Sequence, residues 1–352
     1  MRVKLALVAS SLIVLGGACS SGGREASGTL TRPAHSSPST LSDHRRFAVR
    51  ISASPEPWKL AAPVSRSVVL PSRSGVVILG GLAIGDASTS RIVEVDPATG
   101  HSRIAGHLGV AVHDGAGAVI GGRDFVFGGG STGSTALVQA STAGSAAEVA
   151  SLPESRSDLS AATLDGTTYI VGGYDGSAMT PAVLATKNGV SFRPIARLAI
   201  PVRYAAVAGL GSALWVLGGA ITTTEGGSTY TDAVQKVDLT SGRATVTGRL
   251  PEPMGHATAL LLDGQIFVLG GRSGAVPSAA IFRLDAATGA LVPAGHLPEA
   301  VSDAGSVVVR GVGYLVGGEL AGTAEPTDTV VALRPILKPG SLSPSTPRVP
   351  GR

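Results

Sequence analysis

Short runs of apolar residues recur along the chain, and each run ends in a pair of glycines. The runs are VVILGG, FVFGG, YIVGG, WVLGG, IFVLGG and YLVGG, and their second glycines stand at positions 81, 129, 173, 219, 271 and 318. The intervals between them are 48, 44, 46, 52 and 47 residues, which indicates a repeated structural unit. Because β-branched and aromatic residues dominate the runs, each predicts a strand whose end makes a special demand on the backbone.

The same surroundings accompany each run. An apolar stretch such as 257–262 precedes it, and a turn such as Asp263-Gly264 separates the two. A third strand follows, clearest in IVEVDPATG at 92–100, and its aspartate is suited to accept hydrogen bonds from the N–H groups of the next turn. A fourth strand ends near a Leu-Pro pair such as Leu250-Pro251. Four strands per repeat, without helical periodicity, predict the blade of a β-propeller.

These doublets and turn aspartates resemble the repeat of the kelch family. The resemblance covers residues 56–335 and implies an all-β fold, a six-bladed kelch-type β-propeller with four antiparallel strands per blade. The sixth blade stops after its third strand, at 329–335, so one strand is missing at the C-terminal end. We therefore expect an N-terminal strand, around Trp58–Pro63, to complete that blade and close the ring.

Both ends of the chain differ from the repeats. Residues 1–19 have the basic start, apolar run and small-residue exit of a secretory signal peptide. This segment ends in Cys19, the single cysteine, and LGGAC resembles a bacterial lipobox, in which the cysteine is lipidated; an ordinary cleaved signal is the alternative. Residues 20–46 and 336–352 are rich in Ser, Gly, Thr and Pro, so they predict a flexible tether and a disordered tail around a propeller at 47–335.

Much of the positive charge lies in these ends. Without their nine basic and two acidic residues, 19 basic and 22 acidic residues remain in 47–335, so the folded part is mildly acidic. A nucleic-acid partner would require a basic stripe, and we expect none. We expect a monomer, held at the outer face of the cell membrane by its lipid or else fully secreted, whose partners are extracellular proteins or glycans.

One position of the repeat is polar in all six copies. Fourteen residues before the first glycine of each doublet stand Arg66, Asp114, Asp158, Tyr204, His256 and Asp303. In a propeller this position lies in the connection from the fourth strand of one blade to the innermost strand of the next. We therefore expect the six residues to surround one mouth of the central channel. The alternative is that they are merely solvated residues of a wet channel.

The loops after the doublets are expected to open on the same face. They add Tyr174, Asp175, Arg272 and Glu319 to the predicted binding face, since concave ends commonly hold ligand sites. A metal site needs several ligands within roughly 2.0–2.6 Å of one ion, which a six-membered ring does not favour. We therefore expect neither a metal nor another cofactor. By contrast, the position three residues before the doublet holds five aromatic residues and is interpreted as core.

Two kinds of function follow from the resemblance. A binding module is favoured, because GGSTG at 129–133 fits a G-x-S-x-G pattern but lacks the strand-turn-helix context of a nucleophile. Secreted kelch-like propellers also include galactose oxidase relatives, whose radical cofactor joins a tyrosine to a cysteine, and Cys19 lies outside the repeats. They further include a sialic-acid mutarotase. Such a carbohydrate-active enzyme would need an acid/base pair and cations near the mouth, for which Asp158, His256, Arg203 and Arg272 are the candidates.

Overall fold

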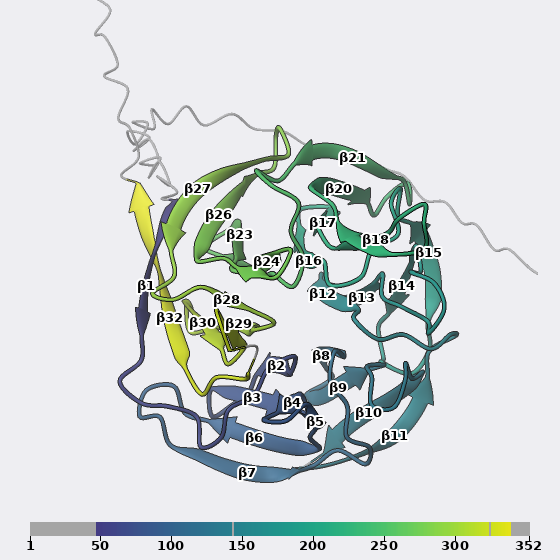
Figure 1. Cartoon of the computed structure of the whole chain (residues 1–352). Helices are drawn as coiled ribbons and strands as arrows, with labels where there is room; N and C mark the ends of the chain where they lie inside the picture. The colour runs from purple at the N-terminus through teal and green to yellow at the C-terminus, as the bar shows by residue number, and fades with distance from the viewer. Residues whose placement is uncertain (1–46, 143, 324, 339–352) are drawn as a thin grey trace, which may run out of the picture. The chain divides into compact units, whose positions relative to one another are not determined.

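Six four-stranded antiparallel sheets surround a central axis (Figure 1). The computed structural model describes residues 47–338, apart from positions 143 and 324, and these residues form strands and loops without a helix. The predicted all-β, six-bladed propeller is therefore confirmed. The predicted signal segment with Cys19, the tether at 20–46 and the tail beyond 338 lie outside the described residues. No segment able to cross a membrane as an apolar helix is found in the part of the chain that the structure describes.

Each blade is built from the inside outward in chain order. Blade 1 comprises β2 (Val68–Pro71), β3 (Val76–Leu79), β6 (Arg91–Val95) and β7 (Ser102–His107). Blade 2 comprises β8 (Ala116–Ile120), β9 (Arg123–Phe127), β10 (Leu137–Thr142) and β11 (Ser145–Ser151). Blade 3 comprises β12 (Ser160–Leu164), β13 (Thr167–Val171), β14 (Ala182–Thr186) and β15 (Arg193–Arg197).

The other three blades repeat this plan. Blade 4 comprises β16 (Ala206–Leu210), β17 (Ala213–Leu217), β20 (Ala233–Asp238) and β21 (Ala244–Arg249). Blade 5 comprises β22 (Thr258–Leu262), β23 (Gln265–Leu269), β26 (Ala280–Asp285) and β27 (Ala290–His296). Blade 6 comprises β29 (Gly305–Val309), β30 (Val312–Val316), β32 (Val330–Lys338) and, outermost, β1 (Phe47–Pro55).

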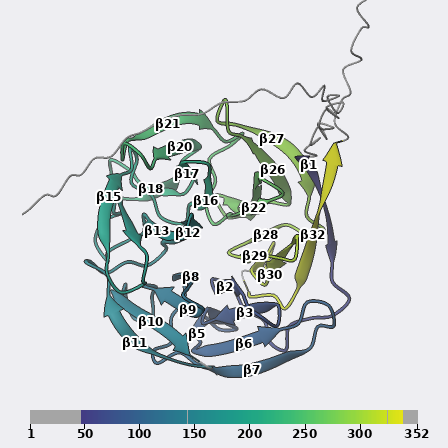
Figure 2. The ribbon, with the colours of Figure 1, turned by 180° about the vertical axis from the view of Figure 1, so that it is seen from behind.

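Short hairpins follow several doublets. They pair β4 (Leu82–Ala83) with β5 (Ala87–Ser88), β18 (Ala220–Thr222) with β19 (Ser228–Tyr230), and β24 (Arg272–Ser273) with β25 (Val276–Pro277). In blade 6, β31 (Glu319–Leu320) pairs instead with β28 (Val301–Ser302). Seen from behind, the strands β7, β11, β15, β21, β27 and β1 form the outer rim of the ring (Figure 2).

An N-terminal strand closes the ring as predicted, but it lies earlier in the chain than expected. The closing strand is β1, which pairs with β32 over eight register positions, whereas Trp58–Pro63 follows it as a loop. Leu60 in that loop donates its N–H to Asp328, the same bond that Leu108 makes to Ser90 in blade 1. The Leu-Pro pattern thus marks the residues after a fourth strand, and β32 runs to Lys338, past the expected boundary at 335.

The second strand of each blade is sandwiched between neighbouring blades. β3 and β17 are buried along their whole length, as expected for strands that are apolar on both faces. The position three residues before the doublet is core in five blades, where the side chains are at most 8% exposed: Val77, Phe125, Trp215, Phe267 and Tyr314. Its sixth member, Tyr169, is only partly buried.

Candidate functional site

The six residues of the polar column share one unusual backbone conformation. All have positive φ, between 51° and 59°, at the point where the chain enters an innermost strand: Arg66, Asp114, Asp158, Tyr204, His256 and Asp303. This left-handed region is uncommon for residues with a side chain, although Asp and His are enriched there. The turn aims each side chain at the mouth of the central channel, so the predicted ring of six residues exists.

Backbone hydrogen bonds join these six residues into a closed circle. The N–H of each residue donates to the carbonyl oxygen of its counterpart in the preceding blade, and the last link runs from Arg66 to Asp303. All six N···O distances lie between 2.8 and 3.0 Å. The circle fixes the spacing of the side chains, because no blade can move without breaking two of its bonds.

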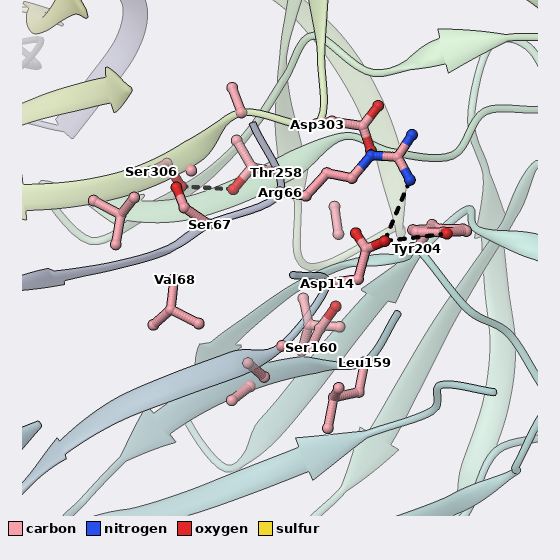
Figure 3. Close-up of a pocket in the computed structure, with 18 of the residues that line it drawn as sticks. Arg66, Ser67, Val68, Asp114, Leu159, Ser160, Tyr204, Thr258, Asp303 and Ser306 are labelled. Atoms are coloured by element: carbon pink, nitrogen blue, oxygen red, sulfur yellow. Dashed lines mark hydrogen bonds and ion pairs between the residues drawn. The ribbon is translucent and has the colours of Figure 1, made fainter. Parts of the chain in front are cut away.

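A cavity of about 220 Å³ lies inside the circle, between the innermost strands (Figure 3). Small residues line much of it, including Gly115, Gly117 and Ala206, and two hydroxyl groups, of Thr258 and Ser306, bond each other at 2.6 Å. Because the wall below the mouth is built from small side chains, the larger groups of the six-residue circle dominate the chemistry at its opening.

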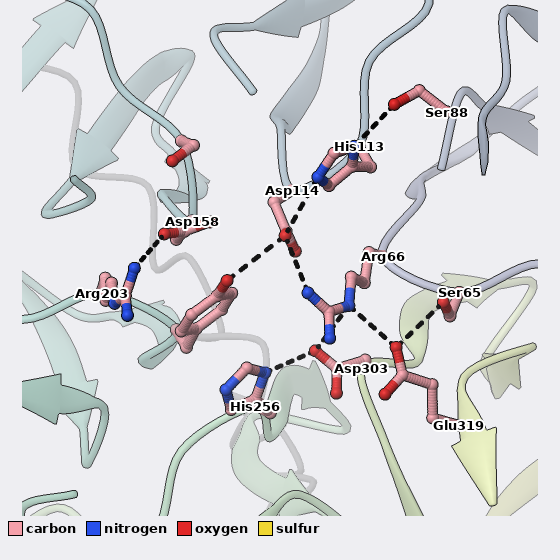
Figure 4. A network of polar contacts seen from close by, with 12 residues as sticks. Ser65, Arg66, Ser88, His113, Asp114, Asp158, Arg203, His256, Asp303 and Glu319 are labelled. Atoms are coloured by element: carbon pink, nitrogen blue, oxygen red, sulfur yellow. Dashed lines mark hydrogen bonds and ion pairs between the residues drawn. The ribbon is translucent and has the colours of Figure 1, made fainter. Parts of the chain in front are cut away.

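Arg66 is the centre of the polar network at the mouth (Figure 4). Its Nε lies 2.8 Å from Glu319 Oε1 and 3.6 Å from Asp303 Oδ1, and its Nη1 lies 3.3 Å from Asp114 Oδ2. Burial lowers the pKa of Arg66, but these three carboxylates outweigh it and raise that pKa above its ordinary value. Arg66 therefore remains a cation, and its guanidinium group interacts with carboxylates from three different segments of the chain.

His256 and Asp303 form a second pair beside Arg66. Nδ1 of His256 lies 2.5 Å from Asp303 Oδ1, and since a carboxylate only accepts, this nitrogen carries the proton. Burial lowers the pKa of His256 in spite of Asp303, so the ring is neutral at pH 7. Burial raises the pKa of Asp303, but the bond from His256 and the charges of Arg66 and Arg272 bring it below its ordinary value.

Aromatic and cationic groups enclose the imidazole of His256. Tyr204 stacks on it with ring centroids 3.8 Å apart, and Tyr230 meets it edge-on at 5.7 Å. Nη2 of Arg272 lies 3.2 Å from Nε2 and 3.3 Å from Nδ1, so the guanidinium group lies against the face of the ring. The Tyr204 hydroxyl in turn lies 3.4 Å from Asp114 Oδ2, so the network extends across the mouth.

Asp114 and Asp158 differ in their surroundings. Burial raises the pKa of Asp114 well above its ordinary value, against the opposing charge of Arg66. Asp158 pairs with Arg203, whose Nη1 lies 3.1 Å from Oδ2. Arg203 also lies over the ring of Tyr174, 5.0 Å from its centroid. The mouth therefore combines three arginines with carboxylates in different surroundings.

The residues after the doublets reach the mouth through short bridges to the column. In each blade the first residue after the doublet pairs with the residue just before the polar column, as Tyr174 does with Ser157 and Glu319 with Ser302. These bridges bring Tyr174, Arg272 and Glu319 to the mouth. Asp175 is placed differently, because its carboxylate accepts bonds from the N–H groups of Ser177 and Ala178 and closes its own loop.

The structure also brings in polar residues that the sequence patterns did not single out for the mouth. His113 precedes Asp114, and its Nδ1 lies 2.8 Å from the Ser88 hydroxyl on β5. Ser65 donates to Glu319 at 3.2 Å across 254 residues of sequence. Both lie next to the polar column, so that adjacency was the available signal. Within the described residues, no group of three or more His, Cys, Asp and Glu side chains has the geometry to hold a metal ion.

Comparisons with known proteins support the architecture and do not extend to a family. No protein-family model matches the sequence, and no curated protein matches it. Among solved structures, that of YjhT superposes with a TM-score of 0.64 at 16% sequence identity, over 78% of this chain and 96% of YjhT. At this identity the likeness shows a shared propeller fold.

Proposed function

We propose that this protein is an exported kelch-type propeller, lipid-anchored through Cys19 at the outer face of the cell membrane, that binds a glycan at its channel mouth. One observation carries the proposal: six equivalent positions of six repeats hold polar side chains that converge on a single cavity. Sequence supports the export and the kelch assignment, through the signal pattern and the repeated doublets.

The chemistry of the mouth suits hydroxyl groups. A sugar hydroxyl donates to one group and accepts from another, and here carboxylates and guanidinium groups lie side by side at the opening. Tyr204 and Tyr230 add aromatic surface beside these polar groups. The cavity at the opening has a volume of only about 220 Å³, which favours a small saccharide unit over the protein partner that the sequence also allowed.

A glycan array, followed by calorimetry with each hit, tests this proposal. The key variant combines Asp158→Asn, His256→Asn and Asp303→Asn, because asparagine tolerates positive φ and leaves the backbone circle intact. We expect this variant to lose binding, while Glu148→Gln on the exposed outer strand β11 retains it. Binding that survives the triple change would exclude the mouth as the glycan site.

His256 favours a second candidate, a carbohydrate-active enzyme of the mutarotase type. Its neutral ring has Asp303 at Nδ1, which leaves the lone pair of Nε2 to accept a proton, the arrangement of a general base. Anomer exchange of a sugar needs proton transfer at the anomeric hydroxyl and the ring oxygen. Exchange NMR on sugars found by the array measures this directly, and acceleration that His256→Asn abolishes would favour the enzyme. Equal exchange rates with and without the protein would exclude it.

A further inference from the structure

Of the six residues that stand three positions before a glycine doublet, Tyr169 alone is only partly buried. The difference lies in which neighbouring groups cover the aromatic ring. In blade 4 the equivalent residue is Trp215, and Lys236 stands opposite it in register with its ammonium 5.5 Å from the ring centroid. In blade 2 the equivalent residue is Phe125, and the turn of the next blade covers it. A Cβ on Gly189 of that turn would lie 2.3 Å from the Phe125 ring.

Blade 3 has neither cover. The residue opposite Tyr169 is Ala185, which is too short to reach over the ring. The corresponding turn of blade 4 approaches the backbone instead, since a Cβ on Gly242 would lie 2.5 Å from the carbonyl oxygen of Ile195. A cleft of about 560 Å³ therefore remains between blades 3 and 4, with Tyr169 in its wall.

This cleft is separate from the candidate glycan site. Innermost strands start at the mouth, so the loop that joins β14 to β15 lies at the opposite end of blade 3. The cleft is lined by that loop, by the start of β13 and by the turn that follows β20. None of the residues of the six-residue circle lines it.

Two cations stand at the edge of the cleft. Arg193 is opposite Ala185 in register, and Lys187 directly follows the last residue of β14; both line the cleft. Both are exposed, and no carboxylate among the described residues lies within 4.0 Å of either charged group. The neighbouring acid Asp238 accepts bonds from the N–H groups of its own turn.

We propose that this cleft is a second binding site, which takes an acidic saccharide with its carboxylate between Lys187 and Arg193 and a ring against Tyr169. The hydroxyls of Thr167, Ser191 and Thr240 line the cleft and can bond sugar hydroxyls. A volume of 560 Å³ lies within the range of small-ligand pockets, roughly 300–1,000 Å³. The carboxylate accounts for the unpaired cations, and the ring accounts for the uncovered tyrosine.

Calorimetry of the whole protein with trigalacturonate, and with neutral maltotriose as the uncharged comparison, tests the site. We expect trigalacturonate to bind at least about tenfold more tightly than maltotriose, because charge-assisted bonds are lost with the carboxylates. The double variant Lys187→Glu, Arg193→Glu should weaken trigalacturonate binding by about tenfold or more. Arg197→Glu, an exposed arginine on β15 outside the cleft, should leave it unchanged.

Ala185→Lys separates this site from a general attraction of anions. The new lysine would cover Tyr169 as Lys236 covers Trp215, so we expect weaker binding although the positive charge increases. The triple mouth variant should bind trigalacturonate as the wild type does. The proposal is overturned if trigalacturonate does not bind, if Ala185→Lys strengthens binding, if the double charge reversal has no effect, or if the mouth variant abolishes binding.

Discussion

Replacing Gly172 by alanine tests whether the glycine doublets are needed for close packing or only for backbone conformation. Gly172 has φ +62°, and a Cβ there would lie 2.4 Å from the carbonyl oxygen of Val202, well inside the 3.4 Å at which ordinary contact begins. Gly166 is the matched control, because it has φ +70° and open space around a Cβ. The two substitutions therefore share the conformational cost and differ in the overlap.

The expected magnitudes follow from these two terms. A left-handed alanine costs about 1–2 kcal/mol, and relieving a backbone overlap of this size costs about 1–3 kcal/mol more. The gain from restricting the unfolded chain, about 0.4–1 kcal/mol, is the same for both variants and cancels in their difference. We therefore expect Gly172→Ala to lower the free energy of unfolding by about 1–3 kcal/mol more than Gly166→Ala does.

Equilibrium unfolding in urea, followed by tryptophan fluorescence, measures both variants under one set of conditions. Equal urea slopes would allow the midpoints to be compared directly as free energies. If the two variants lose the same stability, the carbonyl of Val202 does not restrict the doublet. The glycines would then serve backbone conformation alone.

Three further predictions concern the closing strand β1 and two residues of the six-residue circle. Deleting residues 47–56 removes the eight-position pairing of β1 with β32 and exposes the buried Leu333, so we expect aggregates in size-exclusion chromatography, whereas deleting 20–46 should produce none. Asp158→Ala should be less stable than Asp158→Gly by up to about 1.5 kcal/mol in urea unfolding, because both lose the pairing with Arg203 and only alanine resists positive φ, an effect that its smaller loss of chain entropy on folding partly offsets. Burial lowers the pKa of His256, so the unfolded state binds the proton first and the free energy of unfolding should fall as the pH drops below about 6.5. His256→Asn should flatten that fall between pH 7 and pH 5; an unchanged slope would show that other groups, such as His113, account for it.

The repeat could be predicted from the sequence because the residues that mark it act on the backbone close to them in the chain. Glycine doublets and turn aspartates such as Asp96, which accepts from the N–H of Ala98, depend on residues only a few positions away. Two causes explain the polar column: contacts at the mouth, and the backbone conformation, since positive φ itself favours Asp and His. Arg66 and Tyr204 are not favoured by that conformation, and they make the contacts that span the mouth.

What the sequence could not reveal depends on contacts between distant segments. Arg66 meets Glu319 across 253 residues, and no pattern of either loop specifies that pair. Asp175 was expected at the binding face from its place after a doublet, but its side chain turns back on its own loop. The closing strand was misplaced because the Leu-Pro pattern at Leu60 fixes where a fourth strand has ended rather than where it runs.

The pairing of β1 with β32 has a topological consequence. Phe47 and Lys338 face each other in register, so the described chain begins and ends at neighbouring positions. Joined by a short linker, these two ends would turn the propeller into a covalent circle, and the circle could be opened instead at the exposed turn Gly121-Gly122. Such a circular permutant would keep all six blades and move the seam of the ring from blade 6 to blade 2, because the fold has no blade that must come first.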